Sequence, residues 1–102
     1  MYKAKKPLLS DDDAAALADL FRLLGDPSRL RIVVSCLRTP RAVSDIAERL
    51  GLSVSLVSHH LRLLKGARLV RADRQGKQVY YVADDAHVRR MVEGMVTHIG
   101  EH

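Results

Sequence analysis

Five stretches of the chain place apolar residues at the three- and four-residue spacing of an amphipathic helix. The first, for example, carries Leu17, Leu20, Phe21 and Leu24 at this spacing. Capping residues, glycines and prolines set the expected limits of each helix. The helices are predicted from Asp11 to Gly25, from Asp26 to Thr39, from Ser44 to Gly51, from Ser53 to Gly66 and over residues 85–101.

The pattern changes after the fourth helix. Leu69–Ala72 and Gln78–Val82 are short segments rich in Val and Tyr, and the polar, glycine-containing segment Asp73–Lys77 separates them. Two β-favouring segments on either side of a polar turn predict a β-hairpin with a basic tip. The chain is therefore predicted to be mainly α-helical with one small β-hairpin.

The 102 residues, 47% of them apolar, suffice for one hydrophobic core and are too few for two. Residues 1–102 are therefore interpreted as one domain, with a basic tail over residues 1–10. Cys36 is the only cysteine, which excludes a disulfide framework or a two-thiol redox switch within one chain. We interpret it as a core residue. Because no membrane span or signal peptide is apparent, a cytoplasmic location without a membrane partner is predicted.

Positive charge is concentrated in residues 53–83. The net charge is +5, and this segment contains six basic residues against one acidic residue, Asp73. The six are Arg62, Lys65, Arg68, Arg71, Arg74 and Lys77. Since aromatic residues make up only 4% of the chain, this charge indicates contact with the phosphates of duplex nucleic acid rather than stacking on single-stranded bases.

Residues 44–65 have the helix–glycine–helix order of a helix-turn-helix, and the hairpin over residues 68–83 follows as a wing. In a winged helix-turn-helix the second helix of the motif enters the major groove, and the wing lies along the backbone or minor groove. A winged helix that binds protein is the alternative, which the basic helix and wing disfavour. No role is assigned to His60. The predicted DNA-binding residues are Ser55, Ser58, His59, Arg62, Arg74, Gln75 and Lys77.

The last helix carries a wider apolar stripe than one small domain needs, which indicates contact with a second chain. Its segment also contains the oxygen and nitrogen ligands Asp85, His87, His98 and Glu101, whereas His102 has no assigned role. His87 and His98 are about 16 Å apart along one helix, too far for a single zinc ion. Two such helices, antiparallel in a homodimer, would bring opposite ends together and form two equivalent sites.

Three segments in this order resemble the ArsR/SmtB family of bacterial metal-responsive repressors: residues 23–32, 57–64 and 74–81. The resemblance extends over about residues 14–101 and implies a homodimeric winged helix that binds operator DNA and is released by its inducer. The last segment contains the motif Asp-x-His and, after ten further residues, the motif His-x-x-Glu. This pattern is similar to the fifth-helix site of zinc sensors in that family. It implies that Asp85 and His87 of one subunit and His98 and Glu101 of the other are ligands.

A ligand set without thiolates favours Zn²⁺, with Co²⁺ or Ni²⁺ as alternatives. We therefore predict a homodimeric repressor that binds double-stranded operator DNA, takes no small-molecule substrate and releases the DNA on binding zinc. The same DNA-binding dimer could instead respond to a non-metal signal. A small zinc hydrolase is disfavoured because four protein ligands leave no open position for water and no separate general base is evident. Enzymatic activity is not expected.

Overall fold

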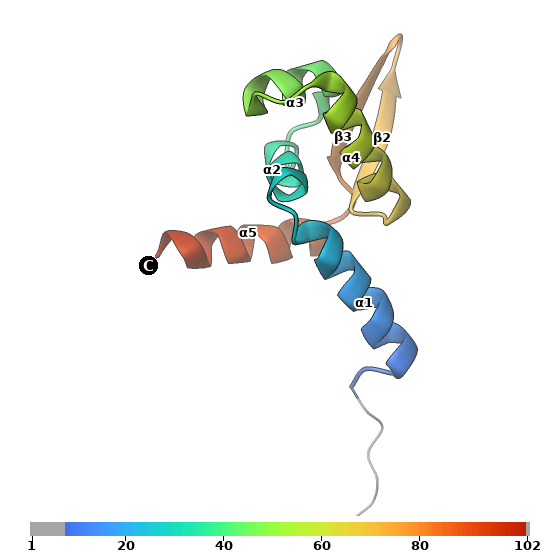
Figure 1. The fold of residues 1–102 in the computed structure, drawn as a ribbon, viewed down its shortest axis with the longest axis vertical. Coiled ribbons are helices and arrows are strands. Elements are labelled where there is room, and N and C mark those ends of the chain that lie inside the picture. The colour runs from blue at the N-terminus through green and yellow to red at the C-terminus, as the bar shows by residue number, and fades with distance from the viewer. Residues whose placement is uncertain (1–7, 102) are drawn as a thin grey trace, which may run out of the picture.

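The computed structural model describes residues 8–101 (Figure 1). Most of the predicted basic tail and His102 lie outside this range. In chain order the elements are α1 (Asp11–Leu24), α2 (Pro27–Ser35), β1 (Arg41–Ala42), α3 (Val43–Leu50), α4 (Val54–Gly66), β2 (Val70–Gln75), β3 (Gln78–Ala83) and α5 (Ala86–Gly100). All five predicted helices and the predicted hairpin are present.

Side-chain caps explain where four of the helices begin. The side chains of Ser10, Asp26, Ser53 and Asp85 each accept a hydrogen bond from the backbone N–H three residues later, at 3.0 to 3.1 Å. These bonds satisfy donors that have no partner inside the helix. Gly51 ends α3 with φ of 67°, a left-handed conformation that glycine adopts without steric cost. The tight turn between α3 and α4 follows from this glycine.

The second helix is shorter than predicted. It ends at Ser35 rather than just before Thr39. The backbone carbonyl of Ser35 accepts a hydrogen bond from Arg41 Nε at 2.6 Å, and the Ser35 hydroxyl donates to the carbonyl of Ile32. The Arg41 bond occupies the Ser35 carbonyl, which would accept a backbone bond if the helix continued. The third helix begins at Val43, one residue before the predicted Ser44.

The strands form a three-stranded antiparallel sheet in the order β1–β3–β2. The hairpin pairs Val70 with Ala83 at its base and Gln75 with Gln78 at its tip. The turn is therefore shorter than the predicted segment Asp73–Lys77, because its first three residues extend β2. Polar side chains do not prevent this, since the backbone makes the ladder bonds. The two-residue strand β1 was not predicted.

The hydrophobic core lies between α2, α3, α4 and the base of the hairpin. Its largest fully buried side chains are Ile32, Ile46, Leu61 and Leu64. A backbone bond from Ala83 to the carbonyl of Cys36, 3.0 Å long, joins β3 to the end of α2. This compact unit is referred to below as the head.

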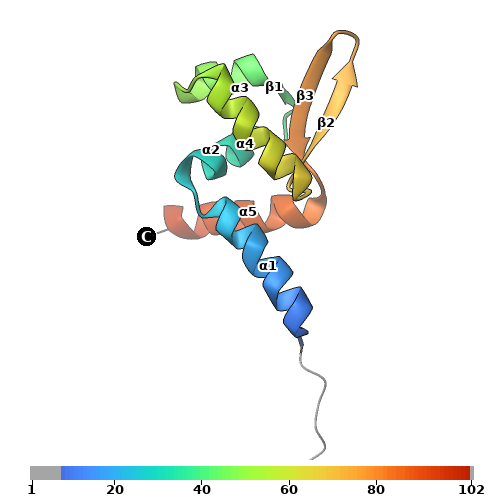
Figure 2. The same ribbon diagram turned by 45° about the vertical axis from the view of Figure 1, so that its right-hand side comes forward.

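The first and last helices project away from the head (Figures 1 and 2). Leu24 is the only buried residue of α1 and Val92 the only buried residue of α5. An ion pair between Arg38 and Glu93 ties α5 to the segment after α2. The predicted apolar stripe of α1 thus exists but is largely uncovered, with Phe21 51% exposed. Within residues 8–101, no helix is long and apolar enough to cross a membrane.

Candidate nucleic-acid interface and metal site

The polar face of α4 lies opposite the core, as predicted. Val57, Leu61 and Leu64 are buried, and this burial fixes the rotation of the helix. Ser55, His59 and Arg62 are exposed on the opposite side, and Ser58 is half-buried beside them. Because Ser53 caps the helix immediately before this face, the small polar side chains stand on its first two turns. Hydroxyl and imidazole groups there can donate to or accept from base edges and phosphates.

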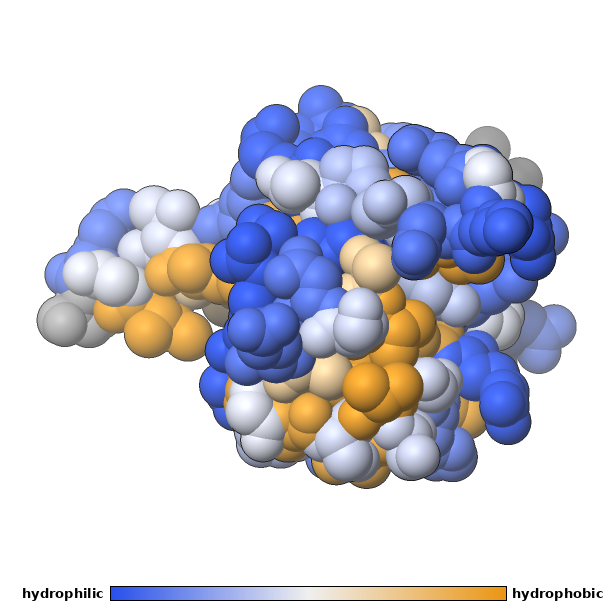
Figure 3. Space-filling view, turned by 90° about the horizontal axis from the view of Figure 1, so that it is seen from above, coloured by the Kyte–Doolittle hydropathy of each residue, from blue (hydrophilic) through white to orange (hydrophobic). Residues whose placement is uncertain are grey.

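The hairpin tip lies at the same end of the molecule as α3 and the start of α4 (Figures 1 and 2). Arg74, Gln75 and Lys77 are all exposed there. Neither Arg74, Lys77 nor Arg62 forms an ion pair within residues 8–101. Figure 3, which looks onto this end, shows mostly hydrophilic surface with an apolar patch between hydrophilic areas. The seven residues predicted to contact DNA are exposed or half-buried, and they are called the reading face below: Ser55, Ser58, His59, Arg62, Arg74, Gln75 and Lys77.

His60 does not share this face. Its side chain is buried between the head elements, with 8% of the residue exposed, and Nδ1 has no hydrogen-bond partner within residues 8–101. Burial lowers the pKa of His60, while the nearby Asp26 carboxylate acts in the opposite direction. The imidazole is therefore neutral near pH 7. The spacing in the sequence could have predicted this burial, because His60 lies three residues after Val57 and four before Leu64, and both of these are buried.

The four predicted metal ligands occupy the two ends of α5. At the start, Oδ1 of Asp85 accepts from the Val88 amide at 3.0 Å, and Oδ2 lies 3.6 Å from Nδ1 of His87. The Val88 hydrogen bond and the adjacent His87 lower the pKa of Asp85. His98 stands in the last turn and Glu101 directly follows the helix. The structure thus brings Asp85 and His87 together at one end of α5 and places His98 and Glu101 three residues apart at the other end.

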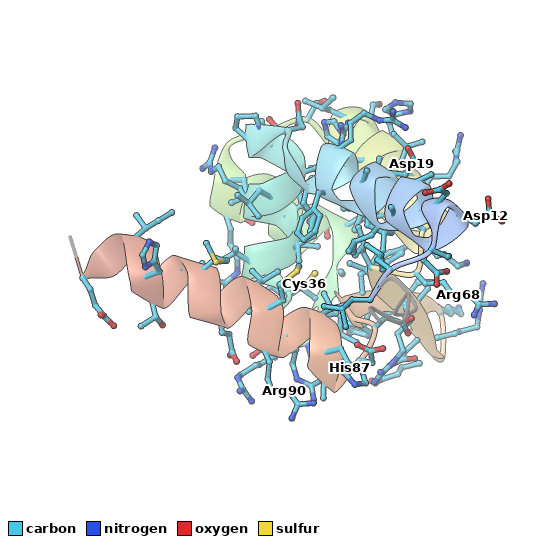
Figure 4. All side chains as sticks on the ribbon, turned by 90° about the horizontal axis from the view of Figure 1, so that it is seen from below. Asp12, Asp19, Cys36, Arg68, His87 and Arg90 are labelled. Carbon is cyan, nitrogen blue, oxygen red and sulfur yellow. The ribbon has the colours of Figure 1, made fainter. Side chains whose placement is uncertain are left out.

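One chain alone does not bring the two pairs together. Within residues 8–101 no three His, Cys, Asp or Glu side chains are grouped so that they could hold a metal ion. The rise of 1.5 Å per helical residue separates His87 from His98 by about 16 Å. His87 is exposed near the base of α5, and the helix extends away from it (Figure 4). Each pair has two nitrogen or oxygen donors, which is half of a four-coordinate zinc shell. The donors fit a metal shared between two copies of α5.

Cys36 offers no sulfur ligand to this site. The residue is fully buried at the end of α2, and its Sγ donates to the carbonyl of Ile32 at 3.3 Å. Burial raises the pKa of the thiol to about 11, so it is protonated near neutral pH. The interpretation of Cys36 as a core residue is confirmed.

An apolar cleft of about 270 Å³ separates the two projecting helices and reaches α2. Next to it, α5 exposes Met95, Val96 and Ile99, the last to 70%. Contiguous exposed apolar surface of this kind marks an interaction site rather than ordinary surface. The cleft is lined by Phe21, Leu24, Gly25, Leu30, Met91, Val92 and Met95.

Residues 26–72, from the start of α2 to the middle of β2, match the sequence profile of the bacterial regulatory protein arsR family. A transcriptional repressor SmtB homolog from Synechocystis sp. is 39% identical over 94 residues, 92% of this chain and 71% of that protein. The chain belongs to the arsR family. Its relatives are named as transcriptional regulators, not as enzymes, and the predicted resemblance is confirmed.

Two further arsR relatives extend the comparison. A cadmium resistance transcriptional regulatory protein CadC homolog from Staphylococcus aureus is 37% identical, over 94% of this chain and 79% of that protein. A solved structure from Mycobacterium bovis is described as a homodimeric winged helix-turn-helix DNA-binding domain of a possible ArsR-family regulator. It is 30% identical, covers 95% of this chain and 93% of its own, and superposes with a TM-score of 0.81. The predicted winged helix-turn-helix fold is confirmed.

Proposed function

We propose that this arsR-family chain is a homodimeric transcriptional repressor that binds operator DNA and releases it when zinc binds between the two subunits. The single observation that carries the proposal is the division of the ligands into two pairs at opposite ends of α5. All four protein ligands can meet around one metal ion there only if two chains join. Metal binding and the relative position of two heads are thereby linked.

The reading face supports the DNA-binding part of the proposal. Its small side chains on the first turns of α4 are suited to base edges in the major groove, and its cations on the hairpin tip are suited to phosphates. In a dimer two such faces are related by a two-fold axis, so the operator is expected to be an imperfect inverted repeat.

The exposed apolar faces of α1 and α5 support the homodimer. Phe21 and Met95 line the same cleft, so one continuous apolar surface includes both helices. A two-fold contact is self-complementary and would cover this surface on both chains at once. The Mycobacterium bovis relative, which has the same fold, is described as homodimeric. We therefore assign α1 and α5 to the dimer contact.

In this dimer, Asp85 and His87 of one subunit, with His98 and Glu101 of the partner subunit, would hold Zn²⁺. The bound ion supplies a cross-link between the two α5 helices. Asp85 keeps its Oδ1 on the Val88 amide and offers Oδ2 in the direction of His87. Two imidazoles and two carboxylates suit Zn²⁺, and Co²⁺ or Ni²⁺ could bind if the shell expands. The CadC relative, named for cadmium resistance, shows that family membership alone does not select the metal.

Regulation then requires that the cross-linked dimer hold its reading faces at a spacing that fits the operator poorly. The coupling free energy of such systems is about 1–3 kcal/mol, and it is reciprocal. Operator DNA must therefore weaken zinc binding by the same factor by which zinc weakens DNA binding. A DNA-binding dimer that responds to a non-metal signal is the competing function, and it predicts no such coupling.

The test is a zinc titration of the protein bound to a fluorescent fragment of its own promoter, read by anisotropy. Two histidine variants serve as controls for each other. His98→Ala is expected to bind DNA like the wild type and to remain bound when zinc is added. His59→Ala is expected to bind one zinc per chain but to bind the fragment weakly.

Release of His98→Ala by zinc at the wild-type concentration would contradict the metal site. Full DNA affinity in His59→Ala would contradict the assigned reading face. Repeating the titration with Co²⁺ and Ni²⁺ ranks the metals, and release by neither these nor zinc would favour the non-metal signal.

A further inference from the structure

A basic hollow lies behind the reading face, where α4 ends and β2 begins. It has a volume of about 420 Å³ and is lined by Lys65, Arg68, Arg71 and Asp84, together with two small apolar residues. Figure 4 looks at the molecule from the end opposite the reading face and labels Arg68 at this edge. The three cations and Asp84 define what is called the rear hollow below.

The rear hollow shares no residue with the reading face, although Arg62 of that face lies one helical turn from Lys65. Lys65 lies ten residues along α4 from Ser55, which corresponds to about 15 Å. Arg71 lies four residues along β2 from Gln75, or about 13 Å. No residue of the reading face lines the rear hollow. Contacts of the reading face with bases therefore do not account for these cations.

Arg71 is held in place while the other two cations lack acidic partners. Its Nη1 donates to the backbone carbonyl of Asp84 at 2.8 Å, and its Nε lies 3.4 Å from Oδ2 of Asp73. Within residues 8–101, neither Lys65 nor Arg68 forms an ion pair. The Asp84 carboxylate offsets part of the charge, but three cations converge on the hollow. The arrangement offers one oriented guanidinium and two adjustable donors.

Capping of α4 does not require these cations. Basic side chains often gather at the C-terminal end of a helix to interact with its last carbonyl groups. Here the carbonyls of Leu63, Leu64 and Lys65 already accept backbone hydrogen bonds, at 2.9 to 3.1 Å, from the amides of residues 67–69. The backbone therefore satisfies these three carbonyls, and capping them does not require the side chains of the three cations.

The backbone of Arg68 gives a second, independent indication. Its φ is +60°, and it is the one residue other than glycine with positive φ in the described part of the chain. An L-residue pays a steric cost in this conformation that glycine does not pay. Strained positions of this kind concentrate at functional sites. An arginine at a position where glycine would be less strained supports a role for its side chain.

We propose that the rear hollow, formed by Lys65, Arg68 and Arg71, binds a phosphate group. Guanidinium and ammonium groups form charge-assisted hydrogen bonds with phosphate oxygens, and Arg can engage two of them at once. The phosphate has two sources: a DNA backbone that passes beyond the reading face, or a free phosphate anion. The DNA source rests on the proposed repressor function, and the free anion does not.

The variant that tests the site is Arg68→Gly. It removes one cation and also relieves the positive-φ strain, so the midpoint of urea unfolding should stay the same or rise. A loss of binding then cannot come from unfolding. Arg31→Ala is the matched control, since Arg31 is exposed on α2 and lies outside both the rear hollow and the reading face.

The first arm titrates inorganic phosphate into the metal-free protein at constant ionic strength and follows backbone amide shifts by NMR. A free-anion site predicts saturable shifts at residues 65–71 that disappear in Arg68→Gly and persist in Arg31→Ala. The second arm measures affinity for the promoter fragment between 50 and 200 mM salt, with short and extended flanks. A DNA contact predicts that Arg68→Gly lowers the salt slope by about 1, and only on extended fragments.

A response specific to Arg68 in either arm supports the proposal and identifies the source. Equal behaviour of Arg68→Gly, Arg31→Ala and wild type in both arms overturns it. Failure of the wild type to bind the promoter at all would instead contradict the repressor function, and the phosphate arm would still decide the rear hollow.

Discussion

Asp85 and His87 form a preset pair at the start of α5, in which one carboxylate oxygen caps the helix and the other lies 3.6 Å from the imidazole Nδ1. The cap fixes the carboxylate before any second subunit is present. The same side chain therefore has a structural role and a proposed ligand role, and two substitutions can separate these roles.

Replacing Asp85 with Asn keeps a side-chain oxygen for the Val88 amide and removes the negative charge, whereas Asp85→Ala removes both. Asn and Asp cap helices about equally well. We expect Asp85→Asn to retain the helix content of the wild type and to lose most zinc affinity. Asp85→Ala should also lose helix content, read by circular dichroism. Wild-type zinc affinity in Asp85→Asn, measured by calorimetry, would rule out the carboxylate as a ligand.

The buried His60 predicts that the head loses stability in acid. Burial lowers the pKa of His60 in the folded chain, so below about pH 6.5, the ordinary His value, the unfolded chain binds more protons. Stability is therefore present at neutral pH and falls as pH decreases through this value. Asp26, Arg29 and His59 are the charged or titratable groups that act on the imidazole.

The corresponding measurement is the free energy of urea unfolding at several values between pH 5.5 and 7.5. His60→Leu should show a shallower pH dependence than wild type. Leu63→Ala, which changes an exposed apolar side chain in the same helix, should keep the wild-type slope. Equal slopes in all three proteins would contradict a neutral buried His60.

Two neighbouring leucines of α4 test the position of the core. Leu64 is fully buried, whereas Leu63 is 39% exposed. Leu64→Ala is expected to reduce the free energy of unfolding by about 2–5 kcal/mol through lost burial and a residual cavity. Leu63→Ala should change it by about 0.5 kcal/mol or less. Comparable losses at both positions, measured by urea unfolding, would mean that α4 is rotated from the orientation described here.

The exposed apolar surface predicts association through α1 and α5. Phe21→Ser and Ile99→Ser each remove an apolar side chain from one of these helices, and both are expected to shift sedimentation equilibrium toward the monomer. Leu63→Ser removes a partly exposed apolar side chain from α4 and should leave the association constant unchanged. A wild type that sediments as a monomer at all concentrations would contradict the proposed dimer.

Much of the head could be predicted because local chemistry decides it. Asp26 and Ser53 cap the helices that they were expected to cap, and Gly51 forms the left-handed turn that defines the helix-turn-helix. The reading-face residues of α4 lie opposite the buried Val57 and Leu61 because the helical period relates the two sides. The limits of the hairpin turn were less predictable, because backbone bonding continues through polar residues.

The environment of particular residues could not be predicted in the same way. The spacing around Phe21 identifies an apolar face. The same spacing is found whether such a face packs in the core or against another chain, so its exposure could not be predicted. Arg68 was recognised as part of the basic segment, while its positive φ depends on how α4 is joined to β2. His87 and His98 were correctly expected to be too far apart in one chain, since helical rise alone determines that distance.

The two projecting helices contribute little to the core, and this makes their order dependent on concentration. Short helices gain most of their stability from packing rather than from intrinsic propensity. The head has its own core, so its stability does not depend on a second molecule. In the proposed dimer, α1 and α5 would be stabilised by association and therefore according to mass action. Dilution should therefore lower the helicity of these segments before the sheet and the reading helix respond. The concentration of the protein in a cell would then determine how much of it is assembled.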